Sequence, residues 1–138
     1  MTQQFDVSLM PYSPLAADHL SRREWQADTL RSKTDRVSMG KYDRAKENDL
    51  QIIARVAELA DRHEISMSQI SLAWLFVKGV AAPIIGSTKI KHLDDAVAAI
   101  DVHLTDDELA YLEEPYQPHE VVGSLTQNPA AGTILVDR

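Results

Sequence analysis

The sequence predicts an α/β fold in which short strands alternate with amphipathic helices. Short apolar segments at 7–10 and 81–85 each end in proline, glycine or hydroxyl residues, as strands that lead into loops do. Apolar residues elsewhere recur at spacings of three and four, the period of a helix packed on one side. No internal repeat, low-complexity tract or linker divides the chain, so we expect one domain over 1–138.

The first predicted strand, over 7–10, ends where Pro11 and Pro14 restrict the backbone and remove hydrogen-bond donors. A polar segment over 17–46 follows, with scattered charges and one apolar anchor, Trp25. Loops of this length inside compact domains are usually functional or disordered. We therefore expect an irregular connection here rather than another regular element.

Two helices are expected next. The first spans about 47–63, where five apolar residues recur at helical spacing: Leu50, Ile53, Val56, Ala57 and Ala60. Ser66 with Gln69 forms a capping box, which predicts a second helix from 67 to 78 that stops at Gly79. Its run over 70–77 is apolar around most of the circumference, so this helix should lie in a buried layer.

A buried parallel strand is predicted over 81–85, because the segment is short, rich in branched residues and bounded by glycine. The helix after it carries Leu93, Val97 and Ile100. A last helix begins at a second capping box and ends before a proline, as three residues indicate: Thr105, Glu108 and Pro115. The tail over 115–138 has no helical pattern.

The junction over 83–93, PIIGSTKIKHL, has the composition of a phosphate-binding loop. Backbone N–H groups at a helix start carry partial positive charge and lack partners within the helix, so an anion satisfies them. Gly86 permits close approach of the backbone, while Ser87, Thr88 and Lys89 add donors and charge. An ordinary strand-to-helix loop is the alternative interpretation.

Four ordered motifs carry a family resemblance: PYSPLA, ISLAWL, PIIGSTKIKHLDDA and LTDDEL. Together they resemble the C-terminal part of an aldo-keto reductase, a family of NADPH-dependent carbonyl reductases, over the chain to about Gly123. The resemblance implies the C-terminal portion of a (β/α)8 barrel, with its seventh strand at 7–10 and its eighth at 81–85. A complete barrel needs roughly 200 to 250 residues. We therefore expect a partial domain made of a strand and cofactor loop over 1–16, the long loop over 17–46, the helices and phosphate loop over 47–114, and the tail.

The resemblance implies a site for NADP(H). It places the nicotinamide against Tyr12, the pyrophosphate along Ser13 and Leu15, and the adenosine end on six residues: Gly86, Ser87, Thr88, Lys89, His92 and Asp95. A cation at position 89 favours NADPH over NADH. Taken without the family, Tyr12 is instead a barrel-rim residue with its hydroxyl in water. Asp18 would repel a diphosphate unless Arg22 or Arg23 offsets its charge.

No segment matches the strands that supply the catalytic aspartate, tyrosine, lysine and histidine of this family. Hydride transfer to a carbonyl needs a proton donor. Tyr42 is a candidate for that proton donor, but its place in the long loop favours a loop-packing or solvent-facing role. We expect no catalytic residue in this chain, which is then a fragment of a reductase of aldehydes and ketones. A non-catalytic nucleotide-binding or protein-interaction module, or an inactive remnant, is the alternative.

Composition narrows the classes of ligand and partner that the chain is expected to bind. The apolar fraction is 44% and the charged fraction 25%, with no apolar run long enough to span a bilayer and no signal-peptide pattern, so a cytoplasmic protein is expected. A net charge of −7 argues against nucleic acid. The absence of cysteine and of a histidine ligand spacing argues against a metal. Expected partners are a small carbonyl substrate for the full-length family, and self-association or a partner that covers the missing part of the barrel.

Overall fold

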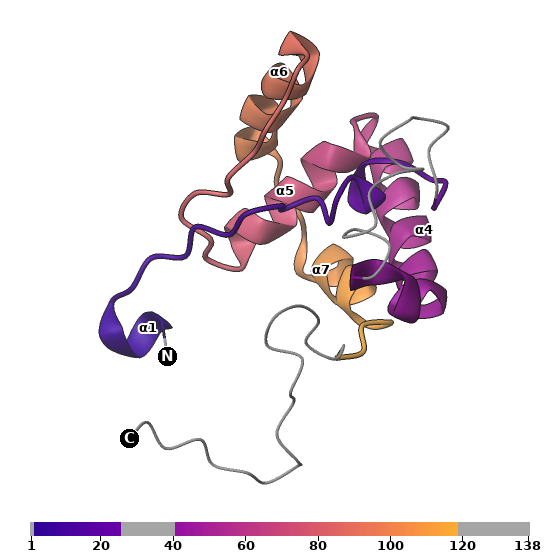
Figure 1. Cartoon of the computed structure of the whole chain (residues 1–138), viewed down its shortest axis with the longest axis horizontal. Coiled ribbons are helices and arrows are strands. Elements are labelled where there is room, and N and C mark those ends of the chain that lie inside the picture. Colours follow the sequence, from indigo (N-terminus) through magenta and orange to yellow (C-terminus); the bar gives the residue numbers. More distant parts are fainter. Residues whose placement is uncertain (1, 26–40, 119–138) are drawn as a thin grey trace, which may run out of the picture.

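The structure is a computed structural model that describes residues 2–25 and 41–118 (Figure 1). Half of the predicted long loop, residues 26–40, and the tail beyond 118 lie outside the described residues. None of the helices described is both long and apolar enough to cross a membrane. The α-helices and 3-10 turns are, in order, α1 (Thr2–Phe5), η1 (His19–Ser21), η2 (Asp43–Ala45), α4 (Lys46–His63), α5 (Met67–Val77), α6 (Ile90–Ala98), η3 (Ala99–Asp101) and α7 (Asp106–Glu113).

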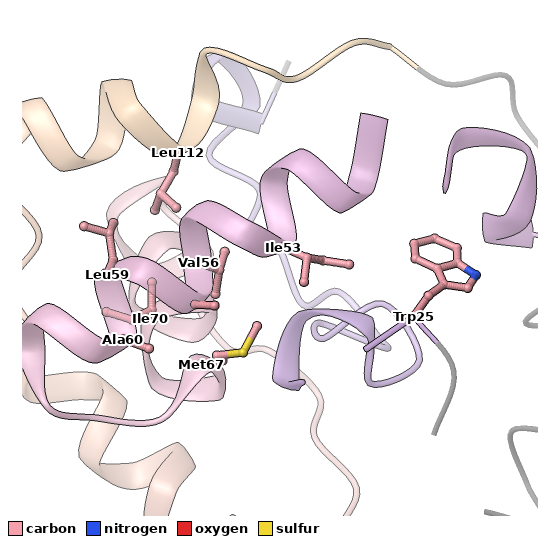
Figure 2. Close-up of a cluster of buried hydrophobic side chains, with 9 residues drawn as sticks. Trp25, Ile53, Val56, Leu59, Ala60, Met67, Ile70 and Leu112 are labelled. Carbon is pink, nitrogen blue, oxygen red and sulfur yellow. The ribbon is translucent and has the colours of Figure 1, made fainter. Parts of the chain in front are cut away.

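Helices α4, α5 and α7 form the core of the described chain, with α4 in contact with both of the others (Figure 1). Leu59, Ile70 and Leu72 are fully buried in this group of helices. Figure 2 shows how side chains from α4, the start of α5 and α7 meet in one cluster, with Trp25 beside Ile53 at one end. The predicted helix over 47–63 and the predicted apolar anchor are both confirmed.

Both predicted capping boxes are confirmed. Ser66 accepts a hydrogen bond from the Gln69 amide at 3.3 Å, and the Gln69 side chain accepts one from the Ser66 amide at 2.8 Å. Thr105 and Glu108 repeat this exchange at 3.3 and 2.8 Å. Gly79 has a φ of +81°, so it takes the left-handed conformation that ends α5 where the sequence predicts.

The buried run predicted over 70–77 holds only for its first half. Residues 70–73 are buried, the next three are half-buried, and Val77 at the end of α5 is 49% exposed. Met67 and Ile70, in the first half of α5, belong to the cluster shared with α4. The sequence prediction was wrong for the end of the helix, because an apolar circumference does not by itself provide a neighbouring element that covers it.

The two predicted strands are each reduced to isolated bridges in the described chain, which corrects the prediction of regular strands at 7–10 and 81–85. Leu9 pairs with Val80 and Tyr12 with Ile84, both in parallel. The Pro11 carbonyl accepts from the Ile84 amide at 2.9 Å. A parallel pair is ordinarily buried on both faces within a larger sheet, and two strands alone are marginal. The parallel direction matches the prediction, but the predicted burial over 81–85 is wrong, since Ile84 is 52% and Ile85 37% exposed where no further strand or helix of the described chain covers them.

Helix α6 projects away from the helical core and packs mainly against α5 and η3 (Figure 1). Its large apolar residues face solvent, with Ile90 78% and Val97 66% exposed, and Ile100 in the following turn η3 is 65% exposed. The helix predicted around Leu93, Val97 and Ile100 is confirmed. Its apolar face has no cover among the described residues.

Candidate nucleotide-binding site

The loops that follow the two paired segments leave the same end of the pair. Because the bridge between Tyr12 and Ile84 is parallel, Ser13 begins one loop beside the point where Gly86 begins the other. Tyr12 and Gly86 are 74 positions apart in the sequence. Tyr12 itself forms the bridge to Ile84, and Gly86 lies two residues beyond that bridge. The structure therefore places the beginnings of the two loops side by side, at Tyr12 and Ile84.

The first loop is strained. Four of its residues that are not glycine have positive φ values, namely Ser13 at 54°, Ala16 at 49°, Ala17 at 53° and Asp18 at 73°. A side chain makes the left-handed region costly by about 1 kcal/mol per residue or more. The Ser13 hydroxyl accepts from the Ala17 amide at 3.3 Å, and the Ala16 amide donates to the Ser13 carbonyl at 3.0 Å. These local bonds hold a tight curve directly after Tyr12, whose side chain is 73% exposed.

The second loop is open. A side chain at Gly86 would meet nothing within 4 Å, so the glycine leaves free space rather than relieving a clash. Ser87 accepts from the Lys89 amide at 3.0 Å and donates to the Lys89 carbonyl at 2.8 Å. Lys89 is the N-cap of α6, and no side chain caps that helix. Thr88, Lys89 and His92 are exposed.

Each of the predicted site residues can now be placed. Tyr12, Ser13 and Leu15 stand at or just beyond the end of the first paired segment, with Ser13 and Leu15 half-buried. Residues 86–89 form the turn into α6, and Asp95 is half-buried farther along that helix. Their roles toward NADP(H) stay predictions, because placement alone does not test them.

The arginines expected to offset Asp18 have other partners among the described contacts. Arg23 forms an ion pair with Asp61 at 2.6 Å. Arg22 donates to the backbone carbonyls of Glu24 and Trp25 at 3.1 and 3.3 Å. The structure thus pairs the two guanidinium groups elsewhere, and Asp18 stays exposed at the rim of the loop.

A lysine that sequence reasoning did not select lies beside the candidate site. The Lys41 ammonium is 5.2 Å from the ring centre of Tyr12 and 5.4 Å from that of Tyr42. Burial lowers the pKa of Lys41, but the charges and hydrogen bonds of the two phenols outweigh it, so the pKa is raised overall. Proximity to Tyr12 across 29 positions has no signature in residue spacing, which explains why the prediction missed it.

His19 is the second residue that spacing did not reveal. It is buried, its ring stacks on Trp25 with centres 4.1 Å apart, and its edge contacts Tyr42 at 5.3 Å. Its Nδ1 has no hydrogen-bond partner among the residues that the structure describes. Burial lowers the pKa of His19, and the nearby charge of Arg22 lowers it further against smaller opposing effects of carboxylates. Tyr42 packs against the core, so the packing role expected for it is confirmed.

With this geometry established, comparison with known proteins decides the family. The sequence model of the Aldo/keto reductase family matches residues 1–117. The chain belongs to the aldo/keto reductase family. The predicted resemblance is confirmed, and it covers the helical core, both paired segments and both loops described above.

Individual relatives agree with the family match. The chain is 43% identical over 116 residues to a versiconal hemiacetal acetate reductase of Aspergillus parasiticus, covering 83% of this chain and 34% of that protein. It is 39% identical over 127 residues to a protein named as an aryl-alcohol dehydrogenase of Schizosaccharomyces pombe, covering 89% and 34%. An aldo-keto reductase of Fusarium vanettenii is 38% identical over 117 residues, covering 85% and 31%. The chain thus spans about a third of the length of these relatives.

Proposed function

We propose that this chain supplies the adenosine-phosphate and nicotinamide contacts of an NADPH-dependent aldo-keto reductase, and that the whole enzyme reduces aldehydes or ketones to alcohols. The observation that carries the proposal is the parallel contact of Tyr12 with Ile84, from which both candidate loops depart in the same direction. In (β/α)8 barrels a phosphate site is frequently built from the loops after strands seven and eight with a helix N-terminus. In this chain the two candidate loops leave a shared parallel contact, and α6 begins after the second of them.

The residues present fit a phosphorylated nucleotide. Gly86 leaves space for an approaching group, and the N-cap of α6 follows three residues later, at an N-terminus that no side chain caps. Exposed Thr88 and Lys89 add a hydroxyl and a cation at the same end. A cation there complements the adenosine 2′-phosphate that distinguishes NADPH from NADH. When bound, this cofactor supplies the hydride.

Three of the chain's four tyrosines do not meet the needs of a proton donor. A general acid for carbonyl reduction works with a pKa brought down toward neutral pH. Tyr111 donates to Glu58 at 2.5 Å, and this hydrogen bond to the carboxylate raises the pKa of Tyr111. Tyr42 packs against the core and Tyr12 is assigned to the cofactor. We therefore propose that the catalytic group comes from barrel strands outside this sequence, and that this chain alone binds without turnover.

A titration of NADPH, followed by its fluorescence, tests the cofactor role. We expect Lys89→Gln to raise the Kd of NADPH about tenfold or more, the order for one hydrogen bond to a charged group, while the Kd of NADH changes little. Lys91→Gln is the matched control, because neighbours two apart on a helix face different directions. Equal losses in both variants, or no binding by the unaltered chain, would contradict the proposal.

An assay of aldehyde reduction separates the reductase fragment from the alternative, a non-catalytic nucleotide-binding module. The unaltered chain is mixed with the portion of the Aspergillus parasiticus relative that lies outside the matched region, and NADPH consumption is followed with an aromatic aldehyde. Turnover only in the mixture supports a fragment of an enzyme. Binding without turnover in either sample supports the module, and turnover by the chain alone would refute the absence of a catalytic group.

A further inference from the structure

Lys41 lies between two aromatic rings at the edge of the candidate site. Its ammonium is 5.2 Å from the ring centre of Tyr12 and 5.4 Å from that of Tyr42. Lysine over an aromatic face at this distance is held by attraction to the ring quadrupole. One positive charge is thereby fixed against the ring that the proposed site offers to the nicotinamide.

The helical core holds Lys41 from the other side. Tyr42 packs against the core cluster and contacts the edge of His19, which stacks on Trp25. Trp25 in turn donates to Asp43 at 2.9 Å. This chain of contacts ties the segment that carries Lys41 to buried side chains, so the ammonium does not depend on Tyr12 alone for its position.

The charge is permanent at neutral pH. Burial by itself lowers the pKa of Lys41, but the two phenols raise it by more, so the protonated form prevails. The oxidised and reduced nicotinamide cofactors carry the same phosphates, but the oxidised ring bears a positive charge and the reduced ring is neutral. A fixed cation nearby therefore acts differently on the two forms.

We propose that Lys41 is a specificity-determining residue that makes this site bind the reduced cofactor in preference to the oxidised one. The inference rests on the proposed function, in which the nicotinamide lies against Tyr12. Repulsion between the ammonium and the oxidised ring weakens binding of NADP⁺ and leaves NADPH unaffected. Such a preference favours loading of the hydride donor and release of the spent cofactor, as a reductase requires.

The test compares the Kd values of NADP⁺ and NADPH for the full chain by isothermal titration calorimetry. Lys41→Met removes the charge and keeps the length of the side chain, and Lys41→Arg keeps the charge. We expect the ratio of the NADP⁺ Kd to the NADPH Kd to fall about fivefold or more in Lys41→Met, because fivefold is the order expected for two unit charges about 4 Å apart that are fully screened by water. Lys41→Arg should retain the ratio of the unaltered chain.

A merely structural role gives a different result. If Lys41 only positions Tyr12, its loss weakens the binding of NADP⁺ and of NADPH equally and leaves the ratio of their Kd values unchanged. An unchanged ratio in Lys41→Met therefore overturns the inference while leaving the proposed function intact. Failure of the unaltered chain to bind either form overturns both. Salt provides a measurement without a variant, because screening should lower the ratio between 20 mM and 500 mM NaCl if the discrimination is electrostatic. A ratio independent of salt contradicts the inference even if Lys41→Met does not fold.

Discussion

At the scale of single residues, the first loop concentrates backbone strain. Ser13, Ala16, Ala17 and Asp18 are all left-handed although none is glycine. Strain of this kind persists where surrounding contacts determine the conformation, and it gathers at ligand-binding sites. Here the curve directs the chain away from Tyr12 and back toward the helical core, where Ser71 donates to the Leu20 carbonyl at 3.0 Å.

Ala17→Gly should raise the free energy of unfolding by about 0.5 to 1 kcal/mol, because glycine adopts a φ of 53° without the steric cost borne by alanine. Urea denaturation measures the change. The same substitution in the exposed middle of α4, Ala54→Gly, serves as the control and should lower stability by about 1 kcal/mol. A loss of stability from both substitutions would show that the left-handed conformation at 17 is not strained.

His19 predicts a pH dependence of stability. Burial and Arg22 lower its pKa below the ordinary 6.5, against the opposing charges of Asp43 and Asp49, so the fold favours the neutral ring. The unfolded chain then binds the proton first as pH falls. Stability from this group is fully present above pH 6.5 and is lost as pH falls from there through the lower pKa of the folded state.

His19→Phe should remove that dependence while keeping an aromatic ring against Trp25. Urea midpoints between pH 5 and pH 8 measure it: the unaltered chain should lose stability below pH 6.5, and the variant should lose less. His103→Gln, at an exposed position, is the control and should behave like the unaltered chain. If the urea midpoint changed with pH equally in the unaltered chain and in both variants, the pH dependence of stability would not come from His19.

At the scale of elements, the helices were predictable and the strands were not. Capping boxes and helical spacing depend on residues within one or two turns, so they located α4, α5 and α7 closely. Strands depend on distant partners, and the described chain offers the segments at 7–10 and 81–85 only each other. For the same reason the contacts of Lys41 and His19 with residues far away in sequence escaped prediction.

The capping box of α7 gives a prediction at this scale. The Thr105 backbone and side chain and the His63 ring, 2.6 Å away, lower the pKa of Glu108 below its ordinary 4.5. The stability that the Glu108 carboxylate contributes is therefore present above pH 4.5 and is lost as pH falls through the lower pKa of the folded state. Gln still accepts from the N-cap amide, as Gln69 does in α5, so Glu108→Gln removes only the charge and should cost about 0.3 to 1 kcal/mol at pH 7 and almost nothing at pH 3.

Chemical denaturation at the two pH values measures this difference. Asp107→Asn is the matched control, because Asp107 lies in the same first turn without the reciprocal bonds of the capping box. A similar loss at both pH values in Glu108→Gln would mean that the carboxylate does not act through its charge and cap.

At the scale of the whole molecule, apolar surface without cover is the dominant feature. Val7, Leu9 and Met10 are exposed beside the open parallel pair, and α6 exposes its apolar face. Exposed apolar patches that continue from element to element indicate an interaction surface. We propose that this surface takes up either the remaining barrel strands or a second copy of the chain.

Sedimentation velocity tests self-association of the isolated chain. We expect the sedimentation coefficient to rise with concentration, and Val97→Glu with Ile100→Glu to reduce that rise, because both positions are solvent-facing and need no refolding of the core. Substitution of an exposed polar residue in α6, Lys91→Glu, is the control. A monomer at all concentrations whose amides are fully protected from hydrogen exchange would contradict the proposal.

The central claim is that the loops after the two paired segments form one cofactor site, and a ¹H–¹⁵N NMR titration with NADPH tests it most directly. We predict that amide resonances over 13–17 and 86–92 shift together and fit a single Kd, while those of α7 stay in place. Shifts confined to one loop, or two loops that titrate with different Kd values, would contradict the claim.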